Sequence, residues 1–226
     1  MKATRLALFL TAAICAGSCS GPDSQDATVD TAATGTVIGF DHVAEGTLPD
    51  GWRVGASDSG RPHADWSVLG DSNASSPPNV LSLTRTNHAS QEAFNLCLAE
   101  KAQFGDGTLA VSVRADGGAV DQGGGPIWRV RDEDNYYVCR VNPLESNFRV
   151  YVVKNGVRHQ LGTALAECRA GEWHRVQVEH VGSHITCSLD GQKLLDVEDG
   201  TFSAAGGVGV WTKADARTSF DDLRLP

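Results

Sequence analysis

The stretch GGVGVWTKADARTSFDDLRL, residues 206–225, decides the fold class. In its first half, one alternate set of residues can face a core, and it consists of Val208, Val210 and Thr212. The intervening set consists of Gly209, Trp211 and Lys213. Because successive side chains of a strand point to opposite faces, this alternation predicts a strand with one buried face. The second half predicts another strand, and the two together are expected to complete a β-sandwich.

Turn signals upstream indicate that the rest of the chain is also built from strands. Asn155-Gly156 and Asp190-Gly191 are two-residue hairpin turns. They predict the strand pairs Phe148–Lys154 with Val157–Thr163 and His184–Leu189 with Gln192–Val197, a third pair of Pro126–Arg131 with Tyr136–Val141, and a single strand at Trp173–His180. No convincing helical periodicity occurs between residues 36 and 226. The pattern is typical of an all-β sandwich.

The N-terminus predicts export. Lys2 and Arg5 precede an apolar run, residues 6–13, that is too short to span a membrane and is typical of a secretory signal. The run leads into Ala16-Gly-Ser-Cys19, which resembles a bacterial lipoprotein signal with alanine at the usual leucine position. We therefore expect a signal peptide over residues 1–19 and a lipid on Cys19, which would hold the protein in the cell envelope, in the periplasm or at the cell surface. Ordinary cleavage nearby is the alternative.

Composition divides the remainder into a linker and one domain. Residues 20–35 are rich in Ser, Thr, Ala, Asp and Gly, which predicts a flexible linker. Residues 36–226 are long enough for a single domain with a substantial core. The formal net charge of -9 argues against a nucleic-acid partner, which would require a basic surface.

The cysteines of this domain leave two alternatives open. They are Cys97, Cys139, Cys168 and Cys187. In an exported protein, four cysteines are compatible with two disulfides in any of three pairings. The other alternative is that they are buried free thiols. None of them forms a C-x-x-C motif, so a zinc site is not expected.

Several short motifs give the domain a family resemblance. They include Phe40-Asp41, Leu48-Pro-Asp-Gly-Trp52, Asp134-Asn-Tyr-Tyr-Val138, Gly171-Glu-Trp-His174 and the closing stretch. With these motifs the domain resembles exported bacterial domains of the concanavalin A-like (LamG-like) jelly-roll fold, close to the 3-keto-disaccharide hydrolase domain. The resemblance covers essentially the whole domain and implies a jelly-roll β-sandwich of two antiparallel sheets. It does not assign a function, because one fold can support many activities.

Strand alternation predicts a candidate sugar-binding face. If Arg131 lies opposite Tyr136, the core face of this hairpin contains Trp128, Val130, Tyr137, Cys139 and Val141. The outward residues of all the strands then include Arg129, Tyr136, Arg140, Arg149, Tyr151, Trp211 and Lys213. Aromatic rings can stack on a sugar, and arginine can bind a carboxylate. The alternative is a solvated face of paired charges, with Trp211 covered by a loop.

Catalytic and metal-binding signals are weaker. Glycoside hydrolysis usually needs two positioned carboxylates, and the acidic clusters Asp132-Glu-Asp134 and Asp196 to Asp199 are more typical of turns. His174 is expected to be a packed or capping residue. Asp41, with Asp221 or Asp222, could supply oxygen ligands to a structural Ca²⁺ ion where the two ends of the domain meet. The alternative is that these acids only end strands.

The sequence therefore predicts a carbohydrate-binding module without a recognisable catalytic centre. Its partner would be a carbohydrate, with acidic polysaccharides among the candidates, bound through the concave sheet, and its contact with a membrane would be through the lipid alone. The resemblance suggests the alternative of a glycoside or 3-keto-disaccharide hydrolase or lyase. A third hypothesis, an envelope protein that binds other proteins, predicts an exposed apolar patch.

Overall fold

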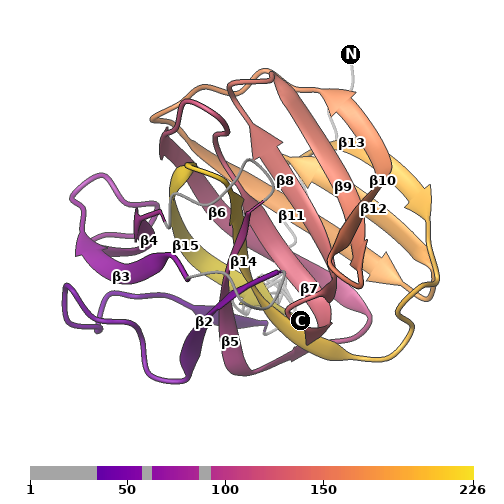
Figure 1. The fold of residues 1–226 in the computed structure, drawn as a ribbon, viewed down its shortest axis with the longest axis horizontal. Coiled ribbons are helices and arrows are strands. Elements are labelled where there is room, and N and C mark those ends of the chain that lie inside the picture. Colours follow the sequence, from indigo (N-terminus) through magenta and orange to yellow (C-terminus); the bar gives the residue numbers. More distant parts are fainter. Residues whose placement is uncertain (1–34, 58–62, 87–92) are drawn as a thin grey trace, which may run out of the picture. The chain divides into compact units, whose positions relative to one another are not determined.

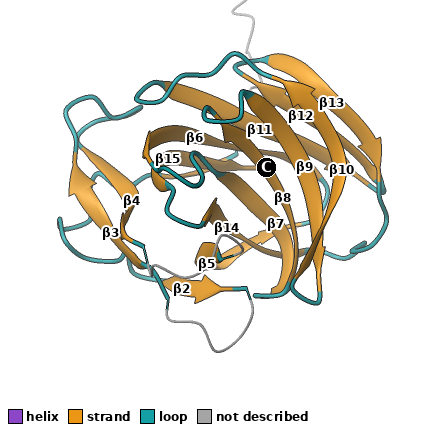
Figure 2. Ribbon diagram, turned by 45° about the horizontal axis from the view of Figure 1, so that its top comes forward, coloured by secondary structure: helices purple, strands orange, loops and turns teal. Residues whose placement is uncertain are grey.

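The computed structural model describes residues 35–57, 63–86 and 93–226, which lie within the compact unit Ala33–Pro226. The described residues form fifteen strands and no helix, and the strands lie in two layers (Figures 1 and 2). No described segment is a helix of the length and apolarity needed to cross a membrane. The predicted signal peptide, Cys19 and the linker up to residue 34 lie outside the described residues.

One layer, sheet A, has eight antiparallel strands. Its main path runs in the order β13 (Gln192–Glu198), β12 (His184–Leu189), β11 (Trp173–Val181), β6 (Gly107–Gly117), β15 (Arg217–Leu225), β4 (Asn79–Arg85) and β3 (Asp65–Gly70). The short strand β1 (Thr36–Ile38) pairs with β15. Sheet A thus brings the first and last strands of the domain together.

The other layer, sheet B, has seven antiparallel strands. Their order is β10 (Val157–Leu165), β9 (Asn147–Lys154), β8 (Asn135–Asn142), β7 (Gly125–Asp132), β14 (Gly206–Lys213), β5 (Phe94–Phe104) and β2 (Trp52–Ala56). The closing stretch of the chain supplies β14 to sheet B and β15 to sheet A. The prediction that it forms two strands of an all-β sandwich is confirmed.

The main core lies between the sheets and follows the predicted alternation. Phe148, Val150 and Val152 of β9 and Val208 and Val210 of β14 all belong to it. A second apolar cluster lies on the outer face of sheet B and includes alternate residues of β9 and β14 together with residues of β5, β7 and β8. The members of this outer cluster are Phe94, Leu96, Leu98, Ile127, Tyr136, Val138, Tyr151, Val153 and Trp211.

Both predicted hairpin turns are present. Asn155 and Gly156 have φ angles of 50° and 75°, and Asp190 and Gly191 have φ angles of 50° and 82°. Two successive residues with positive φ match the twist of the flanking strands, which explains the Asn-Gly and Asp-Gly sequences. These turns join β9 to β10 and β12 to β13.

The predicted register of the β7–β8 hairpin is correct only near its turn. Asp132 pairs with Asn135 as expected, but Ile127 pairs with Val138, a shift of two residues. Arg129 lies between these pairs with a φ of 47°. Such a bulge reverses the alternation of side chains along the strand. Val130, predicted in the main core, therefore packs against the outer cluster of sheet B.

The same bulge makes the prediction for Arg129 wrong. Its side chain is fully buried, and it donates hydrogen bonds to the carbonyl oxygens of Gly105, Gly182 and Phe202 at 3.1, 3.1 and 2.8 Å. It also pairs with Asp106 at 2.7 Å. Arg129 thus ties together loops of both sheets and is not available to a ligand.

The four cysteines are free thiols in this structure. Cys97, Cys139 and Cys187 are buried, and burial raises the pKa of Cys97 and of Cys139. Of the two alternatives that the sequence left open, the structure has free thiols without a disulfide, and Cys168 is only partly buried.

Candidate functional site

The outer face of sheet B is concave. The guanidinium carbon of Arg158 on β10 lies 4.4 Å from the ring centroid of Tyr151 on β9 and 5.2 Å from that of Phe94 on β5. Strands β10 and β5 are five steps apart in the sheet. A flat sheet would separate them by roughly 24 Å, at about 4.8 Å for each step, which two side chains could not bridge. The contact therefore requires the sheet to curve around this face.

Strand pairing brings several predicted site residues into one row across the concave face. Trp211 pairs with Gly125, and Arg140 pairs with Arg149. The register between β7 and β8 places Gly125 opposite Arg140. A Cβ atom at Gly125 would lie 2.0 Å from the Cys139 carbonyl oxygen, so only glycine fits there. Trp211 and Arg140 consequently flank a position that has no side chain.

Arg140 and Arg149 share one carboxylate, that of Glu145. Arg140 is buried and donates to Glu145 Oε2 at 2.9 Å, and Arg149 donates to the same oxygen at 3.2 Å. Asn147 donates to it as well, at 2.9 Å, and also accepts a hydrogen bond from Arg140. The hydrogen bond from Asn147 and the charges of both arginines lower the pKa of Glu145, although its partial burial opposes them. We call these four residues the Glu145 cluster.

Asp121 lies beside this cluster. Its Oδ2 atom is 3.4 Å from Lys213 Nζ, and its Oδ1 atom accepts a hydrogen bond from Asn142 at 2.7 Å. Burial raises the pKa of Asp121 and outweighs the opposing charges of Arg140 and Lys213. The backbone N–H of Asp121 donates to Asp215, which holds the loop in place. The concave face therefore contains one carboxyl with a raised pKa and one with a lowered pKa.

The predicted aromatic platform is present but is not open. Tyr136, Tyr151 and Trp211 are 0%, 3% and 1% exposed. Arg158 covers part of the surface, with its guanidinium 5.9 Å from the Trp211 ring centroid. The prediction that a sugar stacks directly on these rings is therefore wrong for this conformation. The alternative, a covered Trp211, describes it better, and one of the covering groups is an arginine.

Tyr136 has a defined hydrogen-bonding role. Ser57 Oγ donates to the Glu133 carbonyl oxygen at 2.6 Å, so its other hydrogen bond, 2.7 Å from Tyr136 Oη, must be donated by the tyrosine. Burial raises the pKa of Tyr136. Tyr136 is thus a neutral residue that anchors the end of β2 to β8.

Sequence reasoning missed four residues of this face: Asp121, Glu145, Asn147 and Arg158. Arg158 could have been found, because it pairs with Val153 and therefore shares the outward face of β9. Continuing the alternation through the Asn155-Gly156 turn gives this result. Asp121 and Glu145 lie in loops, where no periodic pattern indicates the direction of a side chain.

The predicted calcium ligands do not form a cation site. Asp221 is buried, and its carboxylate accepts hydrogen bonds from the backbone N–H groups of Ser76 at 2.7 Å and Asp222 at 2.8 Å. Burial raises its pKa to about 6, with further contributions from Asp222 and Asp41. Within the described ranges, no three His, Cys, Asp or Glu residues are arranged to hold a metal ion. Asp221 instead fixes the loop between β3 and β4.

His174 is a packed residue, as predicted. Its Nδ1 atom lies 2.7 Å from Asp190 Oδ2, and its Nε2 atom accepts a hydrogen bond from the Arg169 N–H at 3.3 Å. Both ring nitrogens are therefore engaged in holding loops at the start of β11 and the end of β12.

Comparisons with solved structures show the fold. Carbohydrate-binding module CBM66 from Bacillus subtilis is 17% identical, with a TM-score of 0.59 over 78% of this chain and 96% of that chain. A Bacillus subtilis protein of unknown function with a galectin-like fold is 10% identical, with a TM-score of 0.53 over 77% of this chain and 88% of that chain. A search of curated protein sequences gave no match. Both structural likenesses support the jelly-roll sandwich.

A comparison with family models gives a more specific result. The model described as the 3-keto-alpha-glucoside-1,2-lyase-like domain matches residues 39–225, which is nearly all of the described sandwich. The resemblance inferred from the sequence motifs is thereby confirmed, and the chain belongs to the 3-keto-alpha-glucoside-1,2-lyase-like domain family.

Proposed function

We propose that the concave face of sheet B binds a saccharide at the Glu145 cluster. The observation that carries the proposal is the hydrogen-bonding state of Glu145. Its Oε2 atom accepts three hydrogen bonds, whereas its Oε1 atom has no protein donor among the described residues. The Glu145 side chain is 43% exposed and that of Arg149 is 30% exposed. A carboxylate oxygen can accept a hydrogen bond from one sugar hydroxyl, and the neighbouring guanidinium can donate one to the next.

Buried neighbours make this arrangement rigid. Arg140 and Asn147 hold Glu145 from beneath, so the carboxylate loses little conformational freedom when a ligand binds. Membership of a lyase-like family and the fold shared with a carbohydrate-binding module support a sugar as the ligand. Compared with the sequence prediction, the principal contacts move from Trp211 and Tyr151 to Glu145 and Arg149.

The test is a binding screen of the full chain against neutral and acidic oligosaccharides by thermal melting, followed by calorimetry. We expect Glu145→Gln and Arg149→Gln to weaken binding about tenfold, the effect of losing one charge-assisted hydrogen bond. Glu198→Gln is the matched control, because Glu198 is an exposed glutamate on β13 of sheet A. The proposal fails if no saccharide binds, or if Glu145→Gln behaves like the control.

A second function, cleavage by elimination, is favoured by Asp121. Elimination across C1 and C2 of a 3-keto-glucoside needs a base that takes the C2 proton, a cation for the developing enolate oxygen, and an acid that gives a proton to the aglycone oxygen as the C1–O bond breaks. Asp121, with its raised pKa, is suited to proton transfer, and Lys213 and Arg140 supply positive charge beside it. Release of the aglycone from a 3-keto-glucoside would be the readout. Asp121→Asn should abolish release while saccharide binding remains, and an unreactive wild-type protein would exclude this function.

We also propose that the protein meets its saccharide outside the cytoplasm, anchored through a lipid on Cys19. The apolar run and the small residues before Cys19 support this proposal. Labelling cells with a radioactive fatty acid should mark the wild-type protein but not Cys19→Ser. Equal labelling of both proteins would contradict lipidation at this residue.

A further inference from the structure

Two buried hydrogen-bond donors lie close together on the concave face without an acceptor. Arg158 Nη1 and Trp211 Nε1 are both buried and have no hydrogen-bond partner among the described residues. The Trp211 indole approaches the Tyr136 hydroxyl closely enough to affect its pKa, but the two do not reach hydrogen-bond geometry. Buried polar groups are nearly always paired, so two orphaned donors in one place call for an explanation.

Among the described residues, no carboxylate forms an ion pair with Arg158. Glu145 pairs with Arg140 and Arg149, and Glu133 pairs with Arg53. Arg158 is held instead by aromatic rings, with its guanidinium carbon 4.4, 5.2 and 5.9 Å from the ring centroids of Tyr151, Phe94 and Trp211. These rings fix the position of the cation but accept hydrogen bonds only weakly. The positive charge therefore lacks an anionic partner within the described part of the chain.

A carboxylate would supply the acceptor oxygens and the negative charge that this pair of donors lacks. Its two oxygens can accept hydrogen bonds from a guanidinium and a neighbouring N–H at the same time, and its negative charge matches Arg158. A neutral hydroxyl would satisfy one donor but would leave the charge unpaired. The donors lie on the same concave face as the Glu145 cluster, within reach of the same ligand, because Arg149 and Arg158 both approach Tyr151.

We propose that Arg158 and the Trp211 indole N–H bind the carboxylate of an acidic saccharide. This inference rests on the proposed saccharide-binding function and names its ligand class, a chain that contains uronate residues. Trp211 is 1% exposed and Arg158 is one of the groups that cover it, so movement of Arg158 would help to make its N–H accessible. Arg158 can move, because it is half-buried and lies on the edge strand β10. Its side chain would turn with the carboxylate and admit one oxygen beside Trp211.

The test uses saccharides that differ only in charge. Oligogalacturonate and its methyl ester have the same sugar rings, but the ester lacks the negative charge. Calorimetry with the full chain should give about tenfold tighter binding of the acid, the fold-change expected from one charge-assisted pair. Because the sugar backbone is unidentified, the comparison is repeated with alginate and hyaluronan oligosaccharides and their methyl esters.

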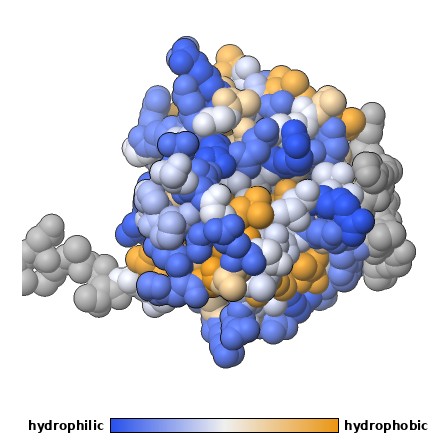
Figure 3. Space-filling view, turned by 90° about the vertical axis from the view of Figure 1, so that its left-hand side faces the viewer, coloured by the Kyte–Doolittle hydropathy of each residue, from blue (hydrophilic) through white to orange (hydrophobic). Residues whose placement is uncertain are grey.

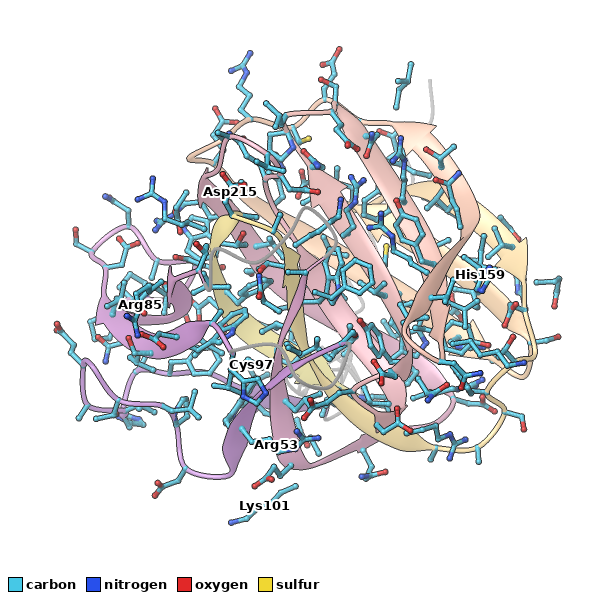
Figure 4. All side chains as sticks on the ribbon, in the orientation of Figure 1. Arg53, Arg85, Cys97, Lys101, His159 and Asp215 are labelled. Atoms are coloured by element: carbon cyan, nitrogen blue, oxygen red, sulfur yellow. The ribbon has the colours of Figure 1, made fainter. Side chains whose placement is uncertain are left out.

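Substitutions then assign the preference to the two donors. Arg158→Gln should reduce the acid-to-ester ratio to about one while binding of the ester persists, which also shows that the variant is folded. Trp211→Phe should reduce the ratio in part. Arg85→Gln is the control, because Arg85 is an exposed arginine on β4, at the opposite side of the view from His159, the residue next to Arg158 (Figure 4).

The outcomes separate the two proposals. Equal binding of acid and ester, or a preference that survives Arg158→Gln, would overturn the carboxylate site and leave saccharide binding intact. No binding of any acidic or neutral saccharide would overturn both. A preference that Arg158→Gln removes and Arg85→Gln retains would support the carboxylate site.

Discussion

Charged side chains on the outer faces of the two sheets differ in how completely they are paired. On sheet A, Arg114 pairs with Asp71 at 2.5 Å and with Asp116 at 2.6 Å, and it lies 4.9 Å from the ring centroid of Trp173. On the concave face of sheet B, considering only the described residues, Arg158 has no carboxylate partner and Glu145 Oε1 accepts no hydrogen bond from the protein. Saturated polar networks stabilise a fold, whereas unsaturated ones are available to a ligand. The contrast supports the proposal that the concave face of sheet B binds the ligand.

The exposed apolar side chains bear on the protein-binding hypothesis. Figure 3 shows the side that carries β3 and β4, where hydrophobic residues lie between larger hydrophilic areas. The exposed large hydrophobic side chains of the described residues are Val37, Leu69, Val120, Leu144, Val157, Leu165 and Val181, and two of them, Val157 and Leu165, share strand β10. An interface for another protein would gather such residues into one patch.

The largest expected effect is on sheet A, where Asp221 should make the free energy of unfolding depend on pH. Burial raises its folded-state pKa to about 6 from an ordinary value of 3.8. The folded protein therefore binds a proton as the pH falls through 6, whereas the unfolded chain does so only near pH 4. This group should add about 3 kcal/mol of stability between pH 7 and pH 4, at about 1.4 kcal/mol for each pH unit.

Urea unfolding of the wild type and Asp221→Asn at pH 7, 5.5 and 4.5 measures this effect. The asparagine cannot ionise, so the stability of the wild type relative to the variant should rise as the pH falls. A constant difference between the two proteins at all three pH values would contradict the raised pKa of Asp221.

Next in size is the loss of Arg114 from the saturated network of sheet A. Arg114→Gln leaves Asp71 and Asp116 without their cation, and both Arg114 and Asp71 are mostly buried. We expect the free energy of unfolding to fall by about 2 kcal/mol, between the values for exposed and buried ion pairs. Arg85→Gln, which breaks an exposed pair with Asp65, should change it by less than about 0.5 kcal/mol. Equal losses would show that the Arg114 network does not stabilise the fold.

The sequence correctly predicted which residues of the regular strands face the core, but it did not predict which residues meet at the candidate site. In β9 and β14, simple alternation correctly separated Val150 and Val210 from Tyr151 and Trp211. In β7 it failed, because a positive φ at Arg129 reversed the alternation, and a bulge leaves no trace in a hydrophobic pattern. The burial of Trp211 and its contact with Arg158 depend on sheet curvature, which follows from strand order and closure.

A smaller effect is expected from Asp215, labelled in Figure 4, whose carboxylate accepts a hydrogen bond from the Asp121 N–H. Burial alone would raise the pKa of Asp215, but hydrogen bonds from the N–H groups of Ala119, Asp121 and Val120 lower it overall. Its contribution to stability is therefore present at neutral pH and is lost as the pH falls below about 4. Asp215→Asn should reduce stability by about 1 kcal/mol at pH 7 and by less at pH 3. Equal losses at both pH values would contradict the lowered pKa.

The smallest effect on stability should come from Arg158→Gln, the counterpart of Arg114→Gln on the concave face. The substitution removes cation–π contacts with three rings, each worth about 0.5–1 kcal/mol at a partly exposed position. It also removes a buried donor without a partner, whose burial costs about 1–3 kcal/mol. Because these terms oppose each other, the free energy of unfolding should change by less than about 1 kcal/mol in urea unfolding at pH 7. A loss as large as that of Arg114→Gln would mean that Arg158 is part of a structural network, and the distinction between the two faces would not hold.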